Sequence, residues 1–132
     1  MSTELRLLAY SAALLIVLVL IQATVGVQSK GLMPLANNRD DVGPATGLHA
    51  RMLRVVDNHR EGLVMFAPLI LIAALIPMSN SWTLLGARMF FYSRVAHALW
   101  YVLGLPLVRP LFWAIGLAGT VIVFLALVGI LQ

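Results

Sequence analysis

With 61% hydrophobic residues and a mean hydropathy of +0.97, the 132-residue chain exceeds the roughly 45 to 50% apolar content of soluble domains, which predicts the bilayer as its solvent. Nine basic and five acidic residues leave a formal charge of +4, too few and too scattered for a nucleic-acid surface. The chain has no cysteine, which excludes disulfides, thiolate metal ligands and a cysteine nucleophile, so any thiol chemistry must use a substrate thiol.

Two membrane helices and a loop are predicted in the first half of the chain. The first apolar segment predicts a helix over residues 5–27, because it reaches the roughly 20 residues that a span requires. Turn-forming and charged residues indicate a polar loop over 28–45. A second helix is predicted over 46–76. Pro77, which follows it, predicts its end, and Pro68 inside it favours a kink. Its apolar part alone is too short to span, so charged turns lie at or inside the membrane boundary.

The second half of the chain predicts two further spans, over 82–104 and 108–131, separated by a Leu105-Pro106 break. The whole chain is therefore expected to be a single all-α domain, 1–132, that forms a bundle of four transmembrane helices.

Basic residues in the connections predict the orientation of these spans. Lys30, Arg39 and Arg109 lie at one predicted membrane face, whereas the connection over 77–86 carries no charge. Because cytoplasmic connections are enriched in Lys and Arg, we expect both termini to face away from the cytoplasm.

Two polar stripes interrupt the apolar helices. The stripe on the second predicted helix consists of Arg51, Arg54, Asn58 and Glu61. At about 100° per residue these positions fall within an arc of roughly 80°. The stripe on the third consists of Arg94, His97 and Tyr101. Since an ionised side chain at mid-membrane costs at least about 2.5 to 3.5 kcal/mol, the stripes should face each other or a wet cavity.

The charge in this predicted cavity favours an anionic ligand. The arginines of both stripes, together with Arg109, outnumber the single carboxylate of Glu61. Guanidinium groups suit carboxylates or phosphates, Asn58 can donate and accept, and Glu61 could hold an ammonium group. A ligand with two carboxylates and one amine would satisfy this set. The competing interpretation is purely structural, with the arginines pairing with Glu61 and Asp57.

The histidines do not predict a metal site. His49 and His59 lie off the stripe at the interfacial end of the second predicted helix, where solvent or lipid-headgroup contact is expected. His97 lies on the stripe, either as a ligand contact or hydrogen-bonded to a neighbouring carbonyl. No H-E-x-x-H or similar spacing occurs, so no metal is expected.

The series Arg51-x-x-Arg54-x-x-x-Asn58-x-x-Glu61-x-x-x-x-Phe66, followed by Arg94-x-x-His97-x-x-x-Tyr101 and Arg109, resembles the MAPEG family, membrane-associated proteins in eicosanoid and glutathione metabolism. The resemblance covers nearly the whole chain and suggests a bacterial-type member similar to microsomal glutathione transferases. It implies a homotrimer of four-helix protomers, in the inner membrane of a bacterium, with glutathione as co-substrate between subunits near the cytoplasmic face.

The resemblance also implies residue roles. Arg51, Arg54, Asn58, Glu61 and Arg94 would hold the glutathione backbone, with His97 and Tyr101 lining the same pocket. Arg109 would be the catalytic residue, because a fixed positive charge beside the sulfur lowers the thiol pKa. The activated thiol would then react with a hydrophobic electrophile that enters from the bilayer.

Several functions stay open at this point. Pro110 stands where the prostaglandin synthase branch has serine, which disfavours prostaglandin isomerase chemistry. Asp57 stands where some members have arginine. Both departures favour a non-catalytic lipid or fatty-acid binder of the same fold, whereas Arg109 favours a glutathione transferase or peroxidase. A small transporter or proton-coupled channel is the third possibility, which liposome flux would reveal.

Overall fold

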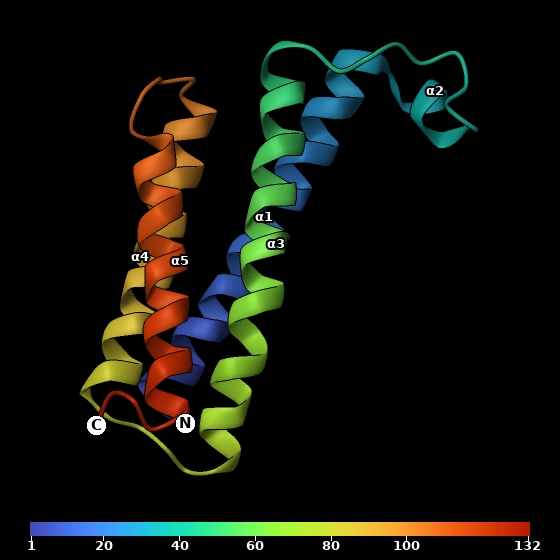
Figure 1. Cartoon of the computed structure of the whole chain (residues 1–132). Helices are drawn as coiled ribbons and strands as arrows, with labels where there is room; N and C mark the ends of the chain where they lie inside the picture. Colours follow the sequence, from blue (N-terminus) through green and yellow to red (C-terminus); the bar gives the residue numbers. More distant parts are fainter.

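The computed structural model describes all 132 residues and is entirely helical. Its helices are α1 (Thr3–Lys30), α2 (Leu32–Ala36), α3 (Gly47–Leu75), α4 (Ser81–Val102) and α5 (Arg109–Leu127). The four long helices alternate in direction, so both termini lie at the same end of the molecule (Figure 1). The predicted all-α membrane protein is thereby confirmed.

Three of the helices, α1, α3 and α5, are long and apolar enough to cross a membrane. The fourth long helix, α4, has 22 residues but is less apolar, because it carries Arg88, Arg94 and His97. The long helix that is not apolar enough to count as a candidate span, α4, is therefore the one that carries the second polar stripe.

Local capping chemistry explains where the helices begin and end. Ser2 accepts a hydrogen bond from the backbone of Leu5 at the start of α1. Asn80 and Thr83 form a reciprocal capping box at the start of α4, which satisfies backbone donors that a helix N-terminus leaves free. Helix α3 ends at Leu75, two residues before Pro77, and it continues unbroken through Pro68.

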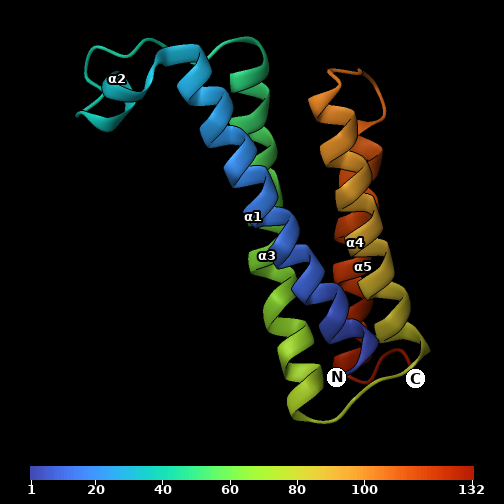
Figure 2. The same cartoon turned by 180° about the vertical axis from the view of Figure 1, so that it is seen from behind.

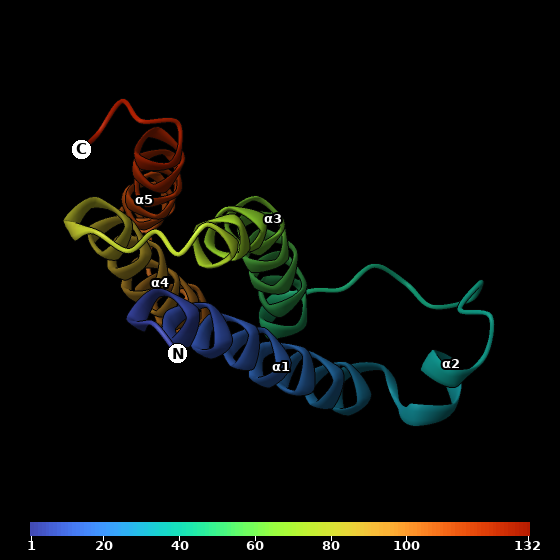
Figure 3. The ribbon, with the colours of Figure 1, turned by 90° about the horizontal axis from the view of Figure 1, so that it is seen from below.

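The predicted polar loop over 28–45 is partly helical, which corrects the expectation. Helix α1 continues to Lys30 and ends at Gly31, whose φ of 85° is tolerated best by glycine. The apolar run Leu32–Ala36 then forms the single turn and a half of α2. This helix and the following loop project sideways beyond α1, on the side away from α5 (Figure 3).

The long helices form two antiparallel pairs, α1 with α3 and α4 with α5, of which α4 and α5 make the more extensive contact. Glycines allow this closeness: a Cβ on Gly86 would lie 2.5 Å from the Gly119 carbonyl oxygen, and one on Gly119 would lie 2.6 Å from that of Gly86. The two pairs converge at the end that holds the termini and diverge toward the other end (Figure 2).

The converging end is tied together by apolar stacking and by one buried carboxylate. Phe66 of α3 and Phe90 of α4 stack with ring centroids 4.0 Å apart. Glu4 of α1 is buried and accepts hydrogen bonds from the hydroxyls of Ser79, at 2.7 Å, and Thr83, at 2.8 Å. The diverging end, where both polar stripes lie, is left more open.

Candidate functional site

Arg94 is a buried cation between α3 and α5. It is 2% exposed, and two glycines make room for it. A Cβ on Gly62 of α3 would lie 2.8 Å from its Nη2, and one on Gly116 of α5 would lie 3.1 Å from its Nε. Its Nη1 donates a hydrogen bond to the side-chain oxygen of Asn58, while its Nε has no partner. The guanidinium is therefore fixed by packing and by a neutral amide, and no carboxylate lies within ion-pair distance of it.

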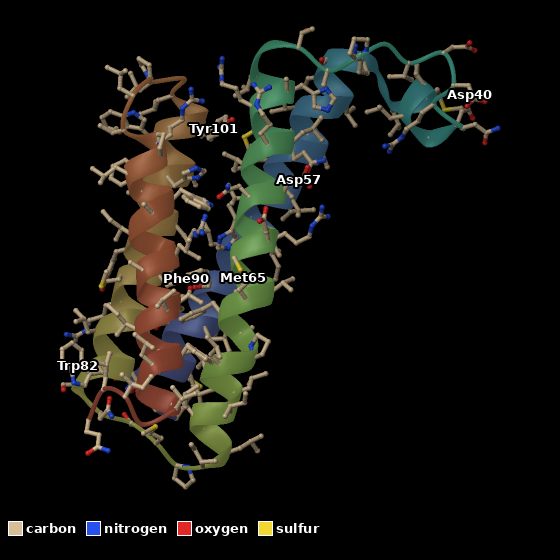
Figure 4. The ribbon with its side chains drawn as sticks, viewed as in Figure 1. Asp40, Asp57, Met65, Trp82, Phe90 and Tyr101 are labelled. Carbon is tan, nitrogen blue, oxygen red and sulfur yellow. The ribbon has the colours of Figure 1, made fainter.

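Tyr101 brings two more guanidinium groups to the same end of the molecule. The Cζ of Arg109, at the start of α5, lies 4.5 Å from the centroid of the Tyr101 ring. The Cζ of Arg54, on α3, lies 5.9 Å from the same centroid, and the His97 ring centroid lies 5.5 Å away. Cations within about 6 Å of an aromatic ring are attracted to its face. Tyr101 of α4 thus lies close to one arginine of α3 and one of α5. It is labelled near the upper end of α4 and α5 in Figure 4.

An open groove of about 600 Å³ lies beside Tyr101 and Arg109. Its lining consists of Asn58, Tyr101, Leu107, Arg109, Pro110 and Trp113. The polar groups come from α3, α4 and the first turn of α5, and the remaining wall is apolar. Such a groove can take a ligand that is anionic at one end and lipophilic at the other.

The remaining predicted site residues lie around this groove at different depths. Arg51 packs against the end of α4, with its Cζ 3.4 Å from where a Cβ on Gly104 would lie. Arg54 and Glu61 are exposed, and Glu61 makes no hydrogen bond or ion pair within the chain. The residues of the predicted stripe therefore differ in their surroundings. Asn58 faces the groove and Arg94, whereas Arg54 and Glu61 lie on the uncovered face of α3.

Ion pairing within the chain leaves the site arginines unpaired. The single salt bridge joins Asp57 and Arg60 at 2.6 Å, with side chains 67% and 64% exposed. Arg51, Arg54, Arg94 and Arg109 all lack a carboxylate partner. The purely structural interpretation, in which these arginines pair with Glu61 and Asp57, does not describe the contacts of the single chain.

His59 is not interfacial, contrary to the expectation. It is 3% exposed, and its Nε2 lies 2.8 Å from the backbone oxygen of Ser11 in α1. His49 is also partly covered by α1, because its Nε2 would lie 3.1 Å from a Cβ on Gly26. The expectation for His59 was wrong because it rested on distance from the predicted membrane centre, whereas α1 packs along this side of α3.

Sequence reasoning missed the apolar wall of the groove. Trp113 and Leu107 line it and are 40% and 89% exposed. The one available signal was spacing, since Trp113 follows Arg109 by one helical turn and so shares its face. Sequence reasoning also missed Arg60, which follows Asp57 by three residues and pairs with it.

The fold and the site define a small, all-helical integral membrane protein with a cationic groove at one end. The model of the MAPEG family matches residues 7–129, nearly the whole chain, and the protein belongs to that family. The family resemblance inferred from the two polar stripes is thus confirmed. Searches of curated proteins and of solved structures gave no significant match.

Proposed function

We propose that the protein binds glutathione in the groove and activates its thiol toward a lipophilic electrophile, as a glutathione transferase or a glutathione-dependent peroxidase. The observation that carries this proposal is the set of guanidinium groups without a carboxylate partner at the end of the molecule where Arg109 lines a groove with an apolar wall. Membership of the MAPEG family, whose name refers to glutathione metabolism, supports the choice of thiol.

The donor set fits the chemistry of glutathione, which has two carboxylates, one ammonium group and one thiol. Arg94 offers a buried guanidinium whose Nε has no partner in the chain, so it can satisfy a carboxylate at little cost in reorganisation. Arg54 and Arg51 would serve the second carboxylate, and Glu61 the ammonium group. His97 and Tyr101 would form the wall behind the ligand.

Arg109 would carry the catalytic role. Its guanidinium is held against the Tyr101 ring, which fixes its position without neutralising it. When bound, glutathione would supply the sulfur nucleophile of the reaction. A fixed positive charge near a thiol favours the thiolate and lowers the thiol pKa. The apolar wall formed by Leu107 and Trp113 would orient the lipophilic substrate beside it.

Completion of the site would require a second copy of the chain. The uncovered face of α3 carries Arg54, Asp57, Arg60 and Glu61, and charged groups facing lipid are costly. Packing of this face against another protomer would bury these charges among polar partners. We therefore propose a homotrimer of four-span protomers, with the groove on the cytoplasmic side and the termini on the opposite side.

The test is thiolate absorbance in the ultraviolet on addition of glutathione to detergent-purified protein. We expect a thiolate signal in the wild type that is lost in Arg109→Ala, while the binding isotherm is weakened less. Arg39→Ala is the matched control, because Arg39 lies in the projecting loop and donates only to the Leu35 carbonyl; this variant should behave as wild type. Absence of glutathione binding in the wild type would refute the proposal. A full thiolate signal in Arg109→Ala would refute the role of Arg109.

The second candidate function is a non-catalytic binder of fatty acids or other anionic lipids. It is favoured by the apolar wall and by Pro110, which occupies the groove next to Arg109. A carboxylate on Arg109 with an acyl chain along Leu107 and Trp113 would fill the same groove. Tight fatty-acid binding that excess glutathione does not displace, with no thiol-dependent turnover, would favour this function over catalysis.

A further inference from the structure

A second groove lies on the outer surface of the α4–α5 pair, away from the candidate site. It has a volume of about 380 Å³. Its lining includes Arg88, Met89, Ser93 and Ala96 from α4, and Phe112 and Ile115 from α5. At about 100° per residue, the α4 residues of this groove point roughly 140° away from the stripe of Arg94, His97 and Tyr101. The two grooves are therefore separate.

Apart from Arg88, the walls of this outer groove are apolar except for the hydroxyls of Tyr92 and Ser93. The Ser93 hydroxyl donates to the backbone oxygen of Phe90, at 2.9 Å, and so has no free donor. Arg88 is exposed and makes no ion pair or hydrogen bond with the chain. An unpaired arginine on the outer face of a helix that packs among membrane spans needs an anionic partner or access to water.

The position of Arg88 along α4 indicates where that partner lies. Arg88 follows the first residue of α4, Ser81, by seven residues, which is about 10 Å along the helix axis. Half of the hydrocarbon core is about 15 Å thick, so Arg88 lies in the half on the side of the termini, and its long side chain can extend toward the headgroups there. From Met89 the groove continues past the membrane centre to Ala96, which follows Ser81 by about 22 Å along the helix axis.

We propose that this groove binds one acyl chain of an anionic phospholipid, whose phosphate pairs with Arg88, in the leaflet on the side of the chain termini. The groove runs in the direction in which acyl chains lie, and its charged end faces the headgroups. Guanidinium suits phosphate because it can donate two parallel hydrogen bonds. The lipid would neutralise the one cation on this face and cover the seam between α4 and α5.

Native mass spectrometry of the detergent-purified protein, with phosphatidylglycerol and phosphatidylcholine of matched chains, tests this proposal. The wild type should retain phosphatidylglycerol preferentially. Arg88→Gln should lower that preference about tenfold, as expected for loss of one charged hydrogen-bonded pair, and Arg88→Lys should restore part of it. Arg6→Gln is the control, since Arg6 is exposed at the same end of the molecule but lies outside the groove.

The chain-binding half of the groove is tested separately by Ala96→Phe, which fills it. This variant should reduce retention of both lipids while leaving glutathione binding unchanged. Unaltered lipid retention in Ala96→Phe, or an unaltered lipid preference in Arg88→Gln, would overturn the proposal. So would a change of oligomeric state in Arg88→Gln without a change in lipid retention, because a second copy of the chain would then occupy the groove.

Discussion

Replacing Gly62 with alanine tests whether the space left by this glycine holds Arg94 at the site. The added Cβ would lie 2.8 Å from the Nη2 and 2.9 Å from the Cζ of Arg94, closer than nonbonded carbon atoms approach. Since Gly116 closes the other side of the same guanidinium, Arg94 cannot move aside without losing its contact with Asn58.

The expected magnitude follows from opposing terms. Alanine in place of glycine favours the helix by about 1 kcal/mol, whereas overpacking a filled interior costs about 1 to 3 kcal/mol. Stability should therefore fall by at most about 2 kcal/mol. Displacement of Arg94 removes a charged hydrogen bond worth about 1.5 to 3 kcal/mol to a bound carboxylate, so the Kd for glutathione should rise about 10- to 100-fold.

The assay combines isothermal titration with glutathione and thermal unfolding in the same detergent. Gly43→Ala is the matched control, because a Cβ there would meet only the Lys30 Nζ at 3.9 Å. If Gly62→Ala instead raises the Tm and leaves the Kd unchanged, Arg94 is not held by this contact and the reasoning is refuted.

Three other substitutions test the packing that supports the site, each by thermal unfolding in detergent. Gly119→Ala should lower the Tm markedly and separate α4 from α5, because its Cβ would meet the rigid backbone oxygen of Gly86 at 2.6 Å; a raised Tm would contradict the close packing. Glu4→Ala should lower the free energy of unfolding by about 1.5 to 3 kcal/mol, since two hydroxyls donate to that carboxylate; an unchanged Tm would show that the carboxylate does not anchor α1. His59→Phe should destabilise by about 0.5 to 1.5 kcal/mol, because it removes the hydrogen bond from the His59 ring to the Ser11 carbonyl of α1; a variant as stable as wild type would argue against this hydrogen bond.

Much of the fold was predictable because long apolar runs and local turn chemistry act within a few residues. The boundary near Asn80 follows from its capping box and Pro77, and the pattern needs no knowledge of the tertiary structure. Helix α2 was missed for the same reason: the run Leu32–Ala36 is too short for periodicity to separate it from a loop.

The site was predictable only as a shared helical face. Spacing placed Asn58 on one helical face with Arg54 and Glu61, but it could not say which of them is covered by another helix. That depends on α5, whose Gly116 gave no signal of a buried arginine opposite it. The burial of His59 could not be predicted for a related reason, because its contact with α1 joins residues that are 48 apart in the chain.

The proposed binding of an anion depends on the partner of the buried Arg94. A carboxylate at position 58 would neutralise the guanidinium and compete with any anionic ligand, as Asp57 does for Arg60 on the exposed face. The amide of Asn58 instead satisfies one donor of Arg94 without cancelling its charge. Burial of a cation without an ion-pair partner costs stability, and Gly62 and Gly116 leave the space in which Arg94 fits without a clash. Because Asn58 is neutral, it can hold Arg94 without cancelling the positive charge that the proposed ligand needs.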